Sequence, residues 1–239
     1  MIHIHIATFL KKLSLSVLIM TVLFILCLWG LFFVADMVFA DKDFSFDENV
    51  FKSIKPWVNE ATTNFMLFIT FFGSQKFLVP ANLAVIFYFA VIRNNRKTAF
   101  QILTISLTSM IVMFSIKFFL QRQRPLVPLI TKVHGYSFPS GHTFCSVTFF
   151  GIIAYIAYKN IATPWLRWSA VFLLLCITIL VGYSRIYLRL HYASDVIAGF
   201  CLGIIWLLLA KQFLLKTEKT KLQEPLTKPA EPLSGPDDL

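Results

Sequence analysis

Long apolar runs alternate with short polar segments along most of the chain. A helix needs about 20 mostly apolar residues to cross a hydrocarbon core of roughly 30 Å. Runs that reach or approach this length lie at approximately 13–35, 77–92, 98–119, 142–158, 166–184 and 194–215. The pattern therefore predicts an all-α integral membrane protein, with a bundle of six transmembrane helices forming one domain over residues 1–215.

A segment between the first two predicted spans has a different pattern. Apolar residues recur at helical spacing from Ile54 to Phe72, with polar residues between them. Its continuous apolar part, 65–72, is interrupted by Thr70 and is too short to cross a membrane alone. We therefore expect an amphipathic helix over 54–72 that lies in the membrane interface, followed by a turn at 73–76.

The Lys and Arg residues of the short loops predict the orientation of the spans. If the N-terminus is cytoplasmic, then 93–97, the loop with Lys159 and Arg167, and the tail after Lys211 are cytoplasmic too. We thus expect a multi-pass plasma-membrane protein with both termini in the cytoplasm. The same parity places three polar regions together on the extracytoplasmic side, namely 41–60, 117–141 and 184–193.

Composition agrees with this interpretation. The chain is 57% hydrophobic and only 14% charged, unlike an ordinary soluble domain. The net charge of +10 does not indicate nucleic-acid binding, because the basic residues lie mostly between apolar runs. In 216–239, four prolines are mixed with Lys, Glu and Asp, which predicts a disordered cytoplasmic tail. The oligomeric state has no readable signal.

The first polar cluster, "KFFLQRQRP" at 117–125, follows the third span. Lys117 and Arg124 are seven residues apart, or two helical turns, so both side chains could point the same way. Pro125 makes continuation of the helix unfavourable. Taken alone, the two cations could also be anchors whose charged ends reach the lipid interface.

The second cluster, "FPSGHTF" at 138–144, has the features of a helix N-terminus. Such an end presents unpaired backbone N–H groups and the positive end of the helix dipole, and so binds anions. Ser140 could supply a hydroxyl, Gly141 would let a ligand approach the backbone, and His142 could exchange a proton with it. A serine cap beside an interfacial histidine is the alternative.

The third cluster, "SRIYLRLHYASD" at 184–195, joins the last two spans. His191 and Asp195 are four residues apart, which stacks them on one face of a helix. A carboxylate in that position can fix the tautomer of the imidazole and leave its other nitrogen free to attack. Arg185 adds a cation. A structural His–Asp pair is the alternative.

Together the clusters suit phosphoryl transfer at one membrane face. Charge in that reaction spreads over three equatorial oxygens, which need surrounding donors while attacking and leaving groups stay in line. The two histidines could serve as nucleophile and acid, in an order that the residues alone leave open. We expect no metal or other cofactor, because the acidic residues are too scattered for a carboxylate metal site. The cations that would hold the phosphate are Lys117, Arg124 and Arg185.

These residues also resemble a known family. K-x6-R-P from Lys117 to Pro125, P-S-G-H from Pro139 to His142 and S-R-x5-H-x3-D from Ser184 to Asp195 are similar to the three-part signature of the type 2 phosphatidic acid phosphatase superfamily. That group includes bacterial lipid phosphatases such as phosphatidylglycerophosphatases and undecaprenyl pyrophosphate phosphatases. Every specified position is filled in the right order.

The resemblance implies a role for each matching residue. His191 would form a phosphohistidine, Asp195 would orient it, and His142 would protonate the leaving oxygen and then activate water. The phosphoryl group would be held by Lys117, Arg124, Ser140, Gly141 and Arg185. Four further polar residues match no family position: Arg122, Arg189, Lys132 and His134. Contact with a lipid headgroup is one alternative for them, and we expect them merely to lie at the interface.

The hypothesis is therefore a metal-independent phosphatase that hydrolyses a phosphomonoester or pyrophosphate of a membrane lipid. Candidate substrates are phosphatidylglycerophosphate, phosphatidic acid and undecaprenyl pyrophosphate. One alternative is a phosphotransferase that passes the phosphoryl group to another lipid or sugar. The other is a transporter of an anionic lipid, although transporter sites usually lie near the bilayer midplane and these charges lie at span ends.

Overall fold

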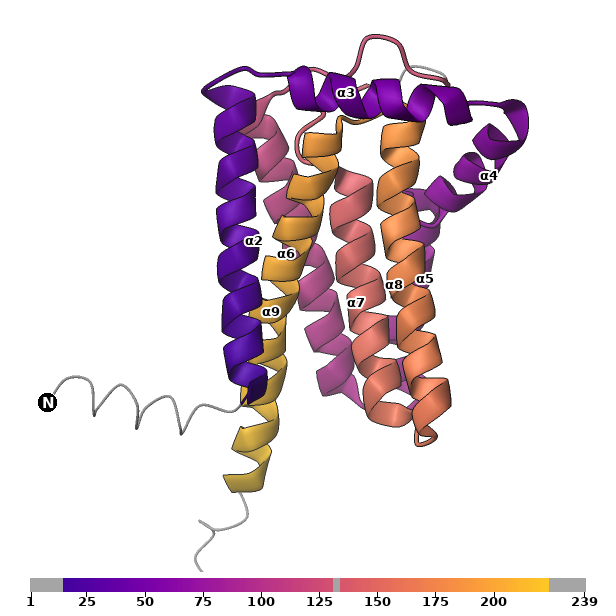
Figure 1. Ribbon diagram of the computed structural model, residues 1–239. Helices are drawn as coiled ribbons and strands as arrows, with labels where there is room; N and C mark the ends of the chain where they lie inside the picture. Colours follow the sequence, from indigo (N-terminus) through magenta and orange to yellow (C-terminus); the bar gives the residue numbers. More distant parts are fainter. Residues whose placement is uncertain (1–14, 131–133, 224–239) are drawn as a thin grey trace, which may run out of the picture.

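The computed structural model describes residues 15–130 and 134–223, and these are helical apart from the connections between helices, of which that between Leu120 and Gly141 is long. Six helical stretches are long and apolar enough to span a membrane, so the predicted six-span α-helical architecture is confirmed. They stand roughly side by side in Figure 1. Their bounds are Val17–Phe39, Glu60–Ile92, Arg96–Leu120, Gly141–Asn160, Pro164–Tyr187 and Ala193–Lys211.

The amphipathic surface helix lies earlier in the chain than the sequence predicts. After α2 (Leu15–Phe39), helix α3 (Ser45–Ile54) runs across one end of the bundle in Figure 1. The 3-10 turn η1 (Lys55–Trp57) then ends it, because Pro56 disfavours helical continuation through Lys55. The prediction of one interfacial helix over 54–72 was therefore wrong in its bounds.

The rest of that segment belongs to the second span. Asn59 caps α4 (Glu60–Phe71) by accepting a hydrogen bond from the Thr62 N–H at 2.9 Å. A break at Gly73 separates α4 from α5 (Gln75–Phe87) and its continuation η2 (Tyr88–Ile92). Apolar residues recur at helical spacing through the 3-10 turn η1 and through the break at Gly73. Periodicity alone therefore merged the surface helix with the start of the span.

The remaining helices form the core of the bundle. They are α6 (Arg96–Leu120), α7 (Gly141–Asn160), α8 (Pro164–Tyr187) and α9 (Ala193–Gln223). Helix α7 packs against α8, α9, α6 and α5, whereas α2 packs mainly on α9. Buried Phe144 of α7 joins α6 and α9 in one apolar cluster with Met113 and Leu202. The N-terminus of α7 is thereby held inside the bundle.

A glycine allows α9 to approach that N-terminus closely. A Cβ atom on Gly199 would lie 2.9 Å from the carbonyl oxygen of Ser140 and 3.0 Å from the Cβ of Thr143. A larger residue would have to push the two helices apart. The backbone N–H of Ser140 also donates to the Asp195 carbonyl oxygen at 3.0 Å. The starts of α7 and α9 are thus fixed against each other.

The last helix extends beyond the predicted span. Helix α9 runs to Gln223, so residues 216–223 of the predicted tail are helical. Their Lys, Glu, Gln and Leu residues favour helix, although a polar composition is also typical of disorder. The predicted tail over 224–239 lies outside the described residues, as do Lys11, Lys12 and Lys132.

Candidate active site

Three segments that are distant in sequence meet at the end of the bundle covered by α3. Lys117 lies in the last turn of α6, His142 in the first turn of α7, and His191 in the turn between α8 and α9. Helix α6 ends at Gln121, whose φ of 45° is left-handed and redirects the chain across the bundle. The loop then returns over this end before α7 begins (Figure 1).

His191 is held between a carboxylate and a guanidinium. Its Nδ1 lies 3.4 Å from Oδ2 of Asp195, and its Nε2 lies 3.2 Å from Nη1 of Arg124. With the proton assigned to Nδ1, the ring donates to Asp195 and keeps a lone pair on Nε2. His191 lines a cavity and is 1% exposed overall. The unprotonated Nε2 therefore lies beside the Arg124 guanidinium, and both residues line the cavity.

Burial keeps the His191 ring neutral. Removal from water lowers the pKa of His191 to about 3, although the hydrogen bond and negative charge of Asp195 act in the opposite direction. Burial likewise lowers the pKa of Arg124, which nonetheless stays protonated as a guanidinium. The site thus combines a neutral imidazole with a permanent cation, as phosphoryl transfer to nitrogen requires.

The three predicted cations line the same cavity, and each is oriented by hydrogen bonds to other parts of the chain. Arg124 donates to the carbonyl oxygens of Gly135 at 2.9 Å and Leu190 at 2.7 Å. Lys117 donates through Nζ to the Tyr136 carbonyl at 2.7 Å. Their positive charges are therefore fixed around the cavity rather than spread over a lipid interface.

Arg185 is oriented by the second span. Its Nη1 donates to Oγ1 of Thr70 on α4 at 2.8 Å, and its Nε is buried without a hydrogen-bond partner among the described residues. A buried donor left unpaired is costly and indicates a missing acceptor. Since Arg185 lines the cavity, a phosphate oxygen of a ligand would fit that need.

The N-terminus of α7 also reaches the cavity, but not through its serine. Gly141 and His142 line the cavity, so the positive end of the α7 dipole would face an anion bound there. Ser140 is fully buried, and its Oγ accepts hydrogen bonds from the N–H and Oγ1 of Thr143. The structure thus uses the Ser140 hydroxyl as a helix cap, and its contact with phosphate stays a prediction.

Sequence reasoning missed a buried network behind Asp195. Arg122 was expected at the interface, and this was wrong: its side chain is 5% exposed and bonds to Asp195 and Asp47. Ser137 donates to Oδ2 of Asp195 and lies 3.3 Å from Nδ1 of His191. Its adjacency to the P-S-G-H motif was the only local hint. Nothing in the local sequence singled out Asp47.

His134 and Arg189, which also match no position of the family signature, lie in different surroundings. His134 is exposed and lines the cavity. Arg189 is half-buried, and its guanidinium lies 5.8 Å from the centre of the Phe51 ring rather than in the cavity. Among the described residues, no three His, Cys, Asp or Glu side chains are grouped as a metal site would require.

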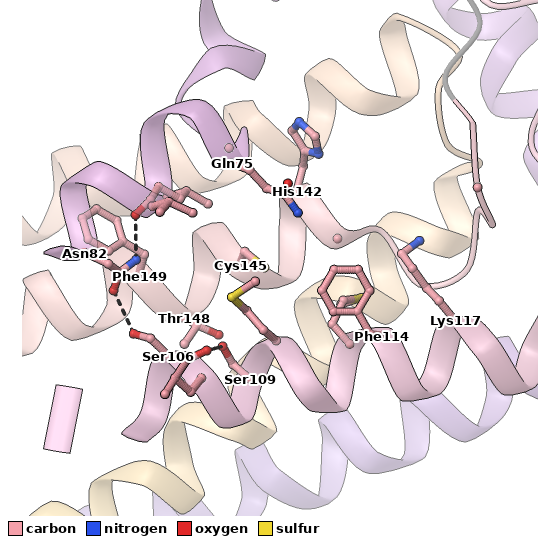
Figure 2. Close-up of a pocket in the computed structure, with 18 of the residues that line it drawn as sticks. Gln75, Asn82, Ser106, Ser109, Phe114, Lys117, His142, Cys145, Thr148 and Phe149 are labelled. Atoms are coloured by element: carbon pink, nitrogen blue, oxygen red, sulfur yellow. Dashed lines mark hydrogen bonds between the residues drawn. The ribbon is translucent and has the colours of Figure 1, made fainter. Parts of the chain in front are cut away.

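The cavity continues from the charged cluster into the bundle. Its volume is about 780 Å³, and most of its remaining lining is apolar and comes from α5, α6 and α7. Figure 2 shows Lys117 and His142 toward one part of it, and Asn82 and Ser106 farther along. Ser106 donates to Oδ1 of Asn82 at 2.8 Å, which links α6 to α5. The cavity therefore has a cationic part and a largely apolar part.

Comparison with known sequences gives three matches. Residues 98–219 match the PAP2 superfamily. Phosphatidylglycerophosphatase B of Bacillus subtilis (strain 168) is 30% identical over 165 residues, which cover 66% of this chain and 76% of that protein. The undecaprenyl-diphosphatase of Sulfolobus acidocaldarius is 27% identical over 175 residues, covering 70% of this chain and 78% of that protein.

Solved structures share the fold. A transmembrane PAP2 type phosphatidylglycerolphosphate phosphatase from Bacillus subtilis superposes with a TM-score of 0.71 at 26% identity, covering 81% of this chain and 96% of the other. LpxE of Aquifex aeolicus superposes with a TM-score of 0.56 at 24% identity, over 71% and 97%. The profile match, the relative at 30% identity and the common fold show that this chain belongs to the PAP2 superfamily, whose members are lipid phosphate phosphatases.

Proposed function

We propose that this protein hydrolyses the phosphate of a membrane lipid through a phosphohistidine at His191, without a metal ion. The observation that carries the proposal is the position of Nε2 of His191 in a cavity that also contains Lys117, Arg124 and Arg185. Those fixed cations supply the charge that a metal ion provides in other phosphatases. The apolar continuation of the cavity suits a lipid chain.

The first half-reaction forms the phosphoenzyme. The lone pair of His191 Nε2 attacks phosphorus while the bond from phosphorus to the lipid oxygen breaks. His142, which lines the same cavity, gives its proton to the leaving oxygen. Asp195 stabilises the positive ring that results, because its negative charge faces the protonated Nδ1 of that ring. The cations Lys117, Arg124 and Arg185, together with Gly141, hold the three transferred oxygens, while the Ser140 hydroxyl caps the helix that presents Gly141.

The second half-reaction returns the enzyme to its starting state. His142, now neutral, takes a proton from a water molecule whose oxygen attacks phosphorus. The bond between Nε2 and phosphorus breaks, its electron pair returns to the ring, and inorganic phosphate leaves. The two half-reactions together consume only the lipid phosphate and one water molecule. Phosphatidylglycerophosphate is the first candidate substrate because the B. subtilis relative at 30% identity is a phosphatidylglycerophosphatase.

We place this site on the extracytoplasmic face of the plasma membrane, with the chain termini in the cytoplasm. The support is the distribution of basic residues in the loops at the opposite end of the bundle, at 93–97 and at Lys159 and Arg167. In right-side-out vesicles, lipid phosphate supplied from outside should then be hydrolysed. Hydrolysis confined to inside-out vesicles would reverse the orientation.

The central test measures phosphate release by purified protein from phosphatidylglycerophosphate, phosphatidic acid and undecaprenyl pyrophosphate. His191→Ala should lower release from each accepted substrate by about 1000-fold or more, because it removes the nucleophile. Arg189→Ala is the control, since Arg189 lies in the same turn and does not line the cavity. Full turnover by His191→Ala would overturn the proposal.

Two further arms of this experiment separate the chemical alternatives. With a metal chelator the rate should change by less than about twofold, since a required metal would make the loss far larger. Radiolabelled phosphate should be recovered free in solution. Its recovery on a second lipid or sugar would indicate a phosphotransferase instead, and lipid movement across vesicles without hydrolysis would indicate a transporter.

A further inference from the structure

The guanidinium of Arg122 joins two buried carboxylates from different parts of the chain. Its Nη1 donates to Oδ1 of Asp195 at 2.6 Å, and its Nη2 donates to Oδ2 of Asp47 at 2.8 Å. Both aspartates are fully buried, and the Arg122 side chain is 5% exposed. The guanidinium also stacks 4.2 Å from the centre of the Tyr192 ring. Arg122 is therefore locked in one position.

Asp47 connects this pair to the surface helix α3 and to the start of α9. It lies in the first turn of α3 and accepts hydrogen bonds from the N–H of Ser194 at 2.9 Å and from the Ser194 hydroxyl at 2.6 Å. Ser194 follows the first residue of α9, so Asp47 caps that helix from another element. The surface helix is thereby tied to the segment that carries Asp195.

The two oxygens of Asp195 have separate partners. Oδ1 accepts from Arg122, while Oδ2 accepts from Ser137 and from the Tyr192 N–H at 2.9 Å and lies 3.4 Å from Nδ1 of His191. Rotation of the carboxylate would break bonds on both sides at once. Arg122 thus restricts Asp195 to the orientation in which it can hold the His191 ring.

The net charge of the four side chains in this network also favours the reaction. Asp47 and Asp195 contribute −2 and Arg122 contributes +1, so the sum is −1 while His191 is neutral. Attack by Nε2 converts the ring into a cation, which brings the sum of these four side chains to zero. An arrangement that becomes neutral as the intermediate forms stabilises that intermediate in a site removed from water.

We propose that Arg122 and Asp47 are positioning residues, which hold Asp195 and through it His191, so that the surface helix α3 is part of the catalytic machinery. This inference rests on the proposed function for its kinetic consequences. Neither residue lines the cavity, so neither contacts the substrate. Their loss should therefore lower kcat and leave KM nearly unchanged.

The test compares Arg122→Gln, Arg122→Lys and Asp47→Asn in the full-length protein. Arg122→Gln should lower kcat about 100-fold, as expected when a catalytic group is misplaced by a remote change. Arg122→Lys should recover part of that loss, because it keeps the charge but cannot bridge both carboxylates. Asp47→Asn should lower kcat about 10-fold, since it frees one end of the guanidinium. Combining Arg122→Gln with Asp47→Asn should add little, because both act on one group.

Two controls test whether the effect is local. Glu48→Gln changes the exposed acidic residue next to Asp47, and Arg189→Gln removes a guanidinium from the same end of the bundle that points to Phe51 instead. Both should keep kcat within about twofold of the unmodified protein, as surface changes away from such networks usually do. Thermal unfolding should be recorded for every variant, and rates compared below the lowest midpoint.

A readout that does not depend on lipid hydrolysis completes the test. Diethyl pyrocarbonate modifies the unprotonated nitrogen of histidine, and mass spectrometry reports its rate at His191. That rate should fall several-fold in Arg122→Gln and Asp47→Asn, because Asp195 no longer fixes the ring. An unchanged modification rate in folded variants, or a raised KM with normal kcat, would overturn the positioning role. If the unmodified protein released no phosphate from lipids, the proposed function would fail while the modification rates still decided the positioning role.

Discussion

The two ends of the helical bundle carry the same basic residue types but surround them differently. At the end covered by α3, Arg122 and Arg185 are almost completely buried and donate to side chains that lie 75 and 115 positions away in the chain. At the opposite end, Arg167 is only half-buried and donates to the carbonyl oxygens of Ile161 and Ala162, which are 6 and 5 positions away. Arg185 lines the cavity described above, whereas Arg167 is not among the residues that line it.

This difference indicates which cations have a function. A half-buried arginine that satisfies nearby carbonyls keeps contact with water and costs little. Buried cations are expensive in a membrane protein and persist where partners or a ligand compensate for them. Arg185 lines the cavity and has a buried Nε without a hydrogen-bond partner among the described residues, so an anion in the cavity could supply an acceptor. The same residue type is thus bound to nearby carbonyl oxygens at one end and is the proposed phosphate ligand at the other.

The sharpest test of this contrast exchanges one arginine at each end for alanine. Arg185→Ala should lower kcat/KM by about 1000-fold, because it removes a donor to the developing charge, while Arg167→Ala should change it by less than about twofold. Steady-state phosphate release from a lipid phosphate measures both. Arg185→Lys should recover only part of the loss, since an ammonium cannot reproduce the guanidinium fork. Equal losses at the two ends would contradict the comparison.

A second prediction concerns the pH dependence that burial imposes on His191. The folded pKa of about 3 lies below the usual value of 6.5, so the unfolded chain binds the extra proton as the pH falls through that window. The free energy of unfolding should therefore decrease from pH 6.5 toward pH 3. By pH 4.5 the decrease attributable to this residue should be on the order of 2 kcal/mol.

Chemical unfolding of the wild-type protein and of His191→Gln at pH 7 and pH 4.5 measures this contribution. The variant should lose less stability over that interval because it lacks the titrating ring. An identical loss in both proteins would mean that the His191 pKa is close to its usual value in the folded state. Arg167→Ala is the matched control from the opposite end and should retain the wild-type pH dependence.

The prediction with the smallest expected effect compares a tightly packed glycine near the site with one elsewhere in the bundle. A Cβ atom on Gly73 would lie 2.4 Å from Cγ1 of Val181 and 3.3 Å from Cβ of His142, so Gly73→Ala should displace the start of α7. We expect a loss of about 1–3 kcal/mol in stability, as for other overpacked sites. A decrease in kcat of about 10-fold should accompany it, because His142 moves.

The comparison variant is Gly151→Ala, whose Cβ would lie 2.3 Å from Cδ1 of Leu207. Because the obstructing atom is the end of a flexible side chain, the stability loss should be no larger than for Gly73→Ala. No residue that we assign to the site touches that position, so kcat should be unaffected. Thermal unfolding and steady-state rates on the same samples separate the two effects. A lower kcat in both glycine variants would show that general loosening of the bundle, rather than displacement of His142, reduces the rate.

Several features of the protein could be predicted because they depend on residues that are close together in the sequence. A run of about 20 apolar residues needs a membrane whatever its neighbours are, so the six spans followed from hydropathy. His191 and Asp195 lie within reach of each other as expected, although His191 lies in the turn before α9 rather than on a helix face with Asp195. Membership of the PAP2 superfamily followed from three short motifs, and the match over residues 98–219 confirms it.

Other features were decided by packing between distant segments. The hydrogen bond from Arg122 to Asp47 joins residues 75 positions apart, and the bond from Arg185 to Thr70 joins residues 115 apart. The cap that the Ser140 hydroxyl forms with Thr143 shows one partner of that hydroxyl, whereas its predicted contact with phosphate stays a prediction. Residue type and periodicity determine which surfaces of a helix are apolar. Only the packed bundle determines which buried polar atoms face each other, because such pairing depends on how helices distant in sequence meet.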